Sequence, residues 1–110
     1  MKKQERVKSN IEFNNIINKG KKINNSFFTV FYMKSKDANP RFGVSVPKRV
    51  GNAVIRNKLK RQTREIINQN KFLFPKYRNY IIIVKDKCLE EKFNINAKAL
   101  IKLIGETHEK

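Results

Sequence analysis

Residues 47–65 read PKRVGNAVIRNKLKRQTRE, and the rest of the chain is organised around this stretch. Gly51 and Asn52 are typical of a helix start, and no proline or glycine follows before Pro75. We therefore predict a helix from about residue 52 to about residue 70. Seven residues of the stretch are cationic and its first acid is Glu65, so the predicted helix is strongly basic.

A helical wheel divides this helix into a cationic arc and an apolar arc. At 100° per residue the cationic arc spans about 140°, and it holds Arg56, Asn57, Lys60, Arg61 and Arg64. Ile55, Leu59 and Ile66 lie on the other side and would face a core. Solvated helix faces usually mix charges of both signs at i,i+4, whereas this one repeats cations at that spacing. The pattern favours RNA or DNA as a partner over a merely solvated face.

The composition describes a small and strongly basic chain. We expect its 110 residues to form one domain over 1–110, which would bind a polyanion, with a loose basic arm at 1–8 and a polar tail at 106–110. Lys and Arg number 26 against 9 Asp and Glu, giving a formal net charge of +17. Nucleic acid is the commonest partner of such a surface, and an anionic membrane is the alternative.

Residues that could perform chemistry are few. Cys88 and His108 each stand alone, so neither a disulfide framework, a zinc knuckle nor a Cys–His nucleophile is expected. The nine acids are scattered, whereas two-metal nuclease chemistry needs clustered carboxylates. We therefore expect no catalytic and no metal-ligating residue. The absence of an apolar run near 18 residues and of a signal-like N-terminus favours a cytoplasmic protein with no membrane partner.

Hydrophobic periodicity predicts a mixed α+β fold in the order α-β-β-α-β-α. The expected elements cover about 10–19, 23–34, 41–47, 52–70, 80–84, and a last helix that begins near Asn94 or Asn96 and ends at Gly105. The second strand is expected to pair antiparallel with the first. The run YIIIV at 80–84 predicts an interior strand. Because a helix connects it to strand 41–47, this strand should run parallel to a neighbour.

The strand at 23–34 has aromatic or apolar side chains on both faces. Phe27, Thr29, Phe31 and Met33 alternate with Phe28, Val30 and Tyr32. Either both faces are buried, or the face of Phe31 is an exposed platform on which nucleobases stack. The strand alone leaves both alternatives open.

The run GNAVIRNKLKRQTRE at 51–65 resembles the signature of the protein subunit of bacterial ribonuclease P, the RNR motif. The pattern R-N-x-x-K-R-x-x-R-E after G-N-A-V is far more specific than a generic basic helix. The upstream FGVSVPKRV at 42–50 is similar to the family's second strand and its exit. The resemblance covers about residues 6–85, and the last helix matches in placement only.

The resemblance implies an α-β sandwich similar to a ribosomal-protein domain, with a left-handed βαβ crossover. It implies ribonuclease P RNA and precursor tRNA as partners, with no obligate protein partner evident. The holoenzyme would be an endoribonuclease that removes the 5′ leader of precursor tRNA. Its magnesium would be bound mainly by the RNA, which would also supply the catalytic groups.

The resemblance also assigns roles to particular residues. The five polar residues of the cationic arc would face the RNA, and Lys48 and Arg49 would contact phosphates. The leader would lie between the first helix and the sheet, against Phe13 and Phe31. Ile17 stands where many relatives have a second aromatic, so only apolar contact is expected there. The alternative is a non-enzymic RNA-binding protein of the ribosomal type, which would need the basic face but no aromatic cleft.

Overall fold

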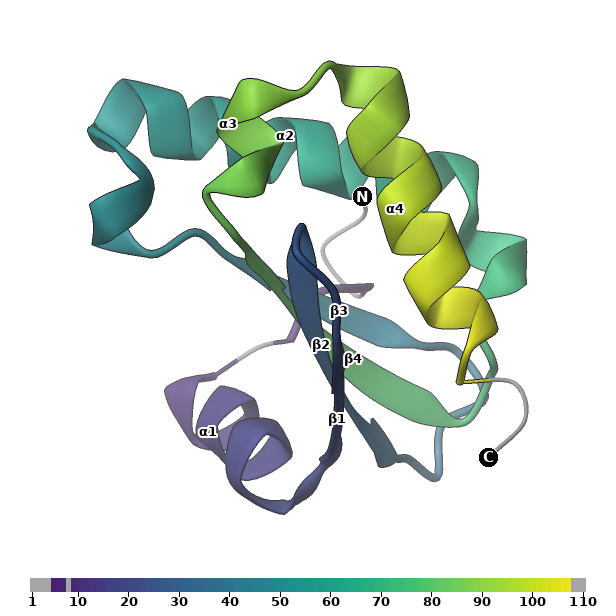
Figure 1. Cartoon of the computed structure of the whole chain (residues 1–110). Helices are drawn as coiled ribbons and strands as arrows, with labels where there is room; N and C mark the ends of the chain where they lie inside the picture. Colours follow the sequence, from purple (N-terminus) through teal and green to yellow (C-terminus); the bar gives the residue numbers. More distant parts are fainter. Residues whose placement is uncertain (1–4, 8, 108–110) are drawn as a thin grey trace.

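The computed structural model describes residues 5–7 and 9–107, which fold around a four-stranded sheet (Figure 1). The strands are β1 (Lys21–Asn24), β2 (Phe28–Lys34), β3 (Arg41–Ser45) and β4 (Arg78–Val84), in the order β1-β2-β4-β3. β2 is antiparallel to both β1 and β4, whereas β3 and β4 are parallel. The predictions of an interior strand at 80–84 and of a parallel neighbour are both confirmed.

Helices lie on both faces of the sheet (Figure 1). α1 (Asn10–Lys19) covers one face, while α2 (Ala53–Gln69) and α4 (Phe93–Gly105) cover the other. The one-turn helix α3 (Lys87–Glu90) lies in the connection between β4 and α4, where no helix was predicted. Single 3-10 turns at Lys48–Val50 and Lys71–Leu73 flank α2. The predicted α+β sandwich is confirmed, and the left hand of its βαβ crossover stays a prediction.

The main core lies between the sheet and the α2–α4 layer. Alternate β2 residues Phe28, Val30 and Tyr32 point into it and are at most 5% exposed. The helices contribute Leu59, Ile66 and Ile67 from α2 and Leu100, Leu103 and Ile104 from α4. The opposite face of the sheet carries a smaller apolar layer, in which Ile16 of α1 and Ile81 of β4 are buried. Large side chains on both faces of β4 explain why it takes an interior place.

Two predictions about the strand at 23–34 are wrong. This segment is a hairpin, because the Asn25 Oδ1 accepts hydrogen bonds from the backbone N–H groups of Phe27 and Phe28, each at 2.8 Å. An asparagine side chain that binds the backbone in this way favours a turn over a continuous strand. The expected antiparallel pairing between β2 and β3 is also absent from the described sheet, since β4 lies between them.

The helix ends agree only in part with the sequence. The Ser9 Oγ accepts from the Glu12 N–H at 3.1 Å, and the Asn52 Oδ1 accepts from the Ile55 N–H at 3.0 Å, so α1 and α2 begin as predicted. Neither Asn94 nor Asn96 begins α4, because Lys92 holds the cap position. Asn96 is buried within the helix, where its Nδ2 donates to the Cys88 carbonyl at 3.0 Å.

The prediction of a loose arm at 1–8 is wrong for residues 5–7, whereas residues 1–4 and 8 lie outside the described residues. The Val7 N–H donates to the Phe42 carbonyl at 3.1 Å, and Arg6 forms a single parallel bridge with Phe42. Glu5 forms an ion pair with Lys71, just after α2. These contacts attach the N-terminal segment to the edge strand β3. At the other end, Thr107 is buried, and residues 108–110 lie outside the described part of the chain.

Candidate RNA-binding surfaces

The cationic arc of α2 forms one wall of a surface hollow of about 380 Å³. We call it the α2 hollow, and its lining residues are Arg6, Asn57, Lys60, Arg61, Arg64 and Glu65. Four residues predicted from the wheel are therefore brought together. They face outward because Leu59, Thr63 and Ile66 of the same helix are buried against the core.

The electrostatics of the α2 hollow follow from the four cations and one carboxylate that the described residues supply. Burial, and next the charge of Arg6, lower the pKa of Arg64 from its usual value. The carboxylate of Glu65 accepts a hydrogen bond from Gln69 Nε2 at 3.0 Å along the helix. Cations held this close repel one another, and an anion with several oxygens would relieve the repulsion while satisfying the guanidinium donors.

Arg6 is a functional candidate that the sequence reasoning missed. No local pattern predicts it, because it is one basic residue among several near the N-terminus. Contacts distant in sequence bring it to α2: Val7 binds Phe42, and Glu5 binds Lys71. The segment therefore adds a fourth cation to the three that the helix supplies.

Three other predicted RNA-binding residues lie outside the α2 hollow. Arg56 is half-buried, and its Nε is buried without a hydrogen-bond partner among the described residues. Lys48 and Arg49 are exposed in the 3-10 turn before α2. The Arg49 Nε lies 3.7 Å from the Asp86 Oδ1 in a solvent-exposed pair, which restrains the side chain only weakly. These two residues extend the basic surface beyond the start of α2.

The three residues predicted to bind the leader lie on the α1 side of the sheet. Phe31 is the cross-strand partner of Ile81, which in turn pairs with Gly43. A Cβ atom added to Gly43 would lie 3.3 Å from two ring atoms of Phe13, so the missing side chain leaves room for that ring. Ile17 follows Phe13 by one turn of α1. We call Phe13, Ile17 and Phe31 the α1-side surface.

The α1-side surface is neither a closed core nor a fully exposed platform. Phe13, Ile17 and Phe31 are each half-buried around the fully buried Ile81. Lys22 on β1 places its Nζ 5.9 Å from the centre of the Phe31 ring. The sequence reasoning did not place Lys22 beside Phe31, because it failed to predict the hairpin across which the two residues pair. A partly accessible ring beside a cation can hold a base and its phosphate together.

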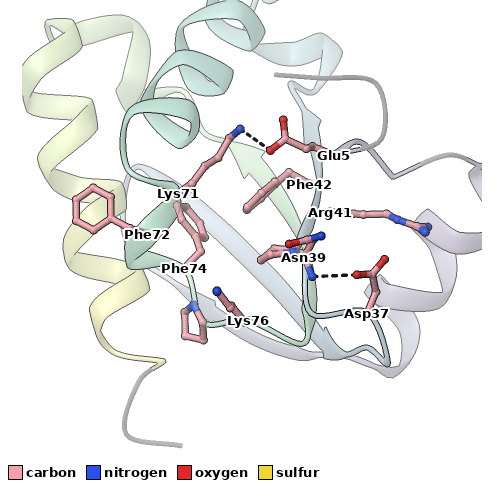
Figure 2. A pocket seen from close by; sticks show the side chains of 11 residues that line it. Glu5, Asp37, Asn39, Arg41, Phe42, Lys71, Phe72, Phe74 and Lys76 are labelled. Atoms are coloured by element: carbon pink, nitrogen blue, oxygen red, sulfur yellow. Dashed lines mark hydrogen bonds and ion pairs between the residues drawn. The ribbon is translucent and has the colours of Figure 1, made fainter.

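A larger hollow of about 610 Å³ lies at the edge of β3 (Figure 2). Its floor includes Phe42 and Phe74, whose ring centres are 5.0 Å apart in an edge-to-face arrangement. Figure 2 shows Lys71 reaching to Glu5 across its rim. Its described lining holds two carboxylates against three cations, so this hollow is close to neutral and does not resemble a polyanion site. Its importance here is that the Glu5–Lys71 pair holds the segment that carries Arg6.

Cys88 is buried, and its thiol donates to the Phe27 carbonyl at 3.3 Å. Burial raises the pKa of this thiol to about 12, which makes it unreactive at neutral pH.

Within residues 5–7 and 9–107, no three His, Cys, Asp or Glu side chains come together as they would around a metal ion. None of the helices in that same part of the chain has the length and apolar character that a membrane crossing requires. His108 lies outside the described residues.

The fold and these surfaces define a class: a small basic α+β protein whose most cationic helix lies on the surface. The chain matches the family model described as Ribonuclease P over residues 1–108. It therefore belongs to the ribonuclease P protein family, as the protein component of an RNA–protein enzyme of tRNA processing that works with the ribonuclease P RNA.

Individual relatives agree with this assignment. The chain is 43% identical to the ribonuclease P protein component of Mycoplasma capricolum, over 96% of its own length and 98% of that protein. Its structure resembles the RNase P protein from Thermotoga maritima, with a TM-score of 0.86 and 32% identity over 93% of this chain and 96% of that one. A mutant of the Staphylococcus aureus RNase P protein gives a TM-score of 0.89 at 30% identity, over 96% of this chain and 90% of that one.

Proposed function

We propose that the α2 hollow binds the ribonuclease P RNA and that the α1-side surface binds the 5′ leader of precursor tRNA. Together these contacts assist the magnesium-dependent cleavage that releases the leader and leaves the mature tRNA 5′ end. The observation that carries the proposal is the convergence of Arg6, Lys60, Arg61 and Arg64 on one hollow. Lys48, Arg49 and Arg56 would add phosphate contacts along the same helix and the turn before it.

The α2 hollow would act by positioning and by neutralising charge. Arginine forks bind two phosphate oxygens at once, and they therefore fix orientation as well as attracting the backbone. Asn57 lies among them and can donate to, or accept from, a ribose or base. Each phosphate that is neutralised also lowers the repulsion between the catalytic RNA and the substrate RNA, which magnesium must otherwise screen.

The α1-side surface would hold the unpaired leader by apolar contact. A base can stack on the accessible side of Phe31, and Phe13 and Ile17 line the adjacent face of α1. Lys22, 5.9 Å from the Phe31 ring centre, would bind the phosphate of that nucleotide. Such contacts distinguish precursor from mature tRNA, because only the precursor has a leader to bind.

Magnesium fits the RNA better than this chain, since the described surface of the α2 hollow offers four cations and one carboxylate. When bound to the RNA, magnesium would activate the water that hydrolyses the phosphodiester. The protein's residues would not touch the reacting atoms. The proposed place of action is the cytoplasm.

Cleavage of a precursor tRNA at low magnesium tests this proposal. A bacterial ribonuclease P RNA would be assayed alone, with the wild-type protein, and with Arg61→Ala/Arg64→Ala. We expect rescue of leader removal by the wild type and little rescue by the double variant. If the wild type binds the RNA tightly but rescues nothing, a ribosomal-type RNA binder becomes the better account.

A further inference from the structure

A second group of cations lies at the end of the sheet where β2 stops. Lys19, Lys21, Lys34 and Arg78 surround a hollow of about 300 Å³, which Tyr32 partly lines. We call this the second basic hollow. It shares no residue with the α2 hollow or the α1-side surface. In Figure 1 the end of β2 is at the bottom of the view, whereas α2 crosses the top.

The strand register places like charges next to one another in this hollow. Lys34 and Arg78 are direct cross-strand partners, and Lys21 pairs with Tyr32 in the neighbouring row. Like charges opposite each other in a sheet are destabilising. None of the four cations forms an ion pair with a residue of 5–7 or 9–107. The carboxylates in that part of the chain that form ion pairs bind other cations. The described residues that line the hollow include no acid either.

Structural roles account for only part of this charge. Lys19 lies in the last turn of α1, where it complements the helix dipole. The Arg78 Nη1 and Nη2 each lie 3.5 Å from the Thr107 carbonyl beyond α4. Lys21 directly follows Gly20, the C-cap residue of α1, so it also lies near this helix end. Lys34, however, is an exposed residue at the end of β2 and lies at no helix end. Its place beside the other three cations requires a different explanation.

The geometry of Arg78 indicates what the hollow could recognise. Its guanidinium carbon lies over the Tyr32 ring, 4.8 Å from the ring centre. Tyr32 is only 5% exposed, so the ring supports the guanidinium from beneath while Arg78 itself is half-buried. A guanidinium held over an aromatic ring can stack an unpaired base on its outer side. The three lysines around it can then bind the phosphate.

We propose that the second basic hollow binds one unpaired RNA nucleotide. Its phosphate would contact Lys19, Lys21 and Lys34, and its base would stack on Arg78. The proposal rests on the proposed function, because that function supplies the RNA. The nucleotide could belong to the ribonuclease P RNA or to precursor tRNA, and these two sources share the same chemistry. The contact would anchor RNA at the end of the sheet opposite α2.

The test compares two triple variants with equal loss of charge. Lys19→Gln/Lys21→Gln/Lys34→Gln removes the lysines of the hollow but leaves Arg78 in place. Lys92→Gln/Lys98→Gln/Lys102→Gln removes three exposed lysines at α4 as the control. Dissociation constants are measured over a range of salt for two reactions: protein with ribonuclease P RNA, and precursor tRNA with the preformed holoenzyme. Thermal unfolding verifies that each variant is folded.

Loss of one phosphate contact should lower affinity about 4- to 5-fold at about 0.15 M salt and reduce the log–log slope by about 0.7–0.9. We expect this change in one of the two reactions, which identifies the source of the nucleotide, and a smaller change in the control. Arg78→Lys keeps the positive charge but removes the planar guanidinium on which the base would stack. This variant should therefore lower the affinity in the same reaction without changing the slope of log K against log salt. Equal affinities for both triple variants in both reactions would overturn the proposal.

The failure of this proposal can be told apart from failure of the proposed function. If Arg61→Ala/Arg64→Ala loses RNA affinity while the lysine variant matches its control, only the second basic hollow is refuted. If the arginine variant also binds RNA as the wild type does, the proposed function itself is refuted, and the nucleotide site falls with it.

Discussion

Replacing Arg61 and Arg64 by alanine should weaken binding to ribonuclease P RNA without unfolding the protein. Arg61 is exposed and Arg64 is half-buried, and both line the α2 hollow. The buried contacts of α2 come instead from Leu59, Ile66 and Ile67. Alanine is the best helix former, and removing Arg64 also removes its repulsion with Arg6. We therefore expect the free energy of unfolding to change by less than about 0.5 kcal/mol.

The size of the binding defect follows from the number of phosphates released. If each arginine neutralises one phosphate, losing two reduces the slope of log K against log salt by about 1.4–1.8. Extrapolated from about 1 M to about 0.15 M salt, that change corresponds to a loss of affinity of about 15- to 30-fold. The loss should shrink as the salt concentration rises, since released counterions supply the driving force.

Fluorescence anisotropy with labelled ribonuclease P RNA over a salt series would measure both quantities. Lys98→Ala/Lys102→Ala is the matched control, because it removes two exposed charges from α4. Equal losses in the two variants would mean that net charge alone drives binding. A defect without a change in slope would mean that the arginines act through structure rather than through phosphate. Either result would refute the reasoning.

Three further predictions concern the rest of the molecule. Phe31→Ala removes one stacking surface, worth about 1–3 kcal/mol, so precursor tRNA should bind the holoenzyme more weakly while mature tRNA is unaffected; equal loss for both would argue against leader contact. Gly20→Ala would place a Cβ 2.5 Å from the Ile16 carbonyl oxygen and 2.7 Å from that of Tyr32, so urea denaturation should show a destabilisation of about 1–3 kcal/mol, and an unchanged midpoint would contradict this. Burial raises the pKa of the Cys88 thiol from 9.0 to about 12, so the folded state holds the thiol proton more tightly than the unfolded state does. The stability that this proton contributes to the folded state is therefore fully present below about pH 9 and is lost as the pH rises above it. Cys88→Ala should therefore lose less stability than the wild type between pH 8 and pH 10, and parallel losses would count against the assigned pKa.

The elements that could be predicted from sequence are those with a local signal. α2 combines a capping asparagine, a clear apolar arc and no breaker, and its wheel identified four residues that line the α2 hollow. β4 was predicted as interior because an uninterrupted apolar run must be covered on both faces. In each case one short stretch of sequence contains all the signals that predict the element.

The elements that could not be predicted depend on long-range contacts. The hairpin of β1 and β2 is only partly such a case, because Asn25 forms its turn through local hydrogen bonds. The Nδ2 of Asn25 also donates to the distant Ala99 carbonyl at 3.1 Å. The position of β4 between β2 and β3 follows from packing across the whole sheet. The prediction that strands adjacent in the sequence pair with each other was therefore wrong for β2 and β3. Arg6 reaches the α2 hollow only through Glu5–Lys71 and the edge of β3.

The central claim is that two separate surfaces bind two different RNAs, and directed hydroxyl-radical cleavage tests it most directly. An iron chelate would be attached to Asn68→Cys, one turn beyond Arg64 on α2, or to Asn24→Cys, beside Thr29 on the face of Phe31. The buried Cys88 keeps background labelling low. In the holoenzyme with precursor tRNA, we predict cleavage of the ribonuclease P RNA from position 68 and of the 5′ leader from position 24. Cleavage of the same RNA from both positions, or an untouched leader, would contradict the account.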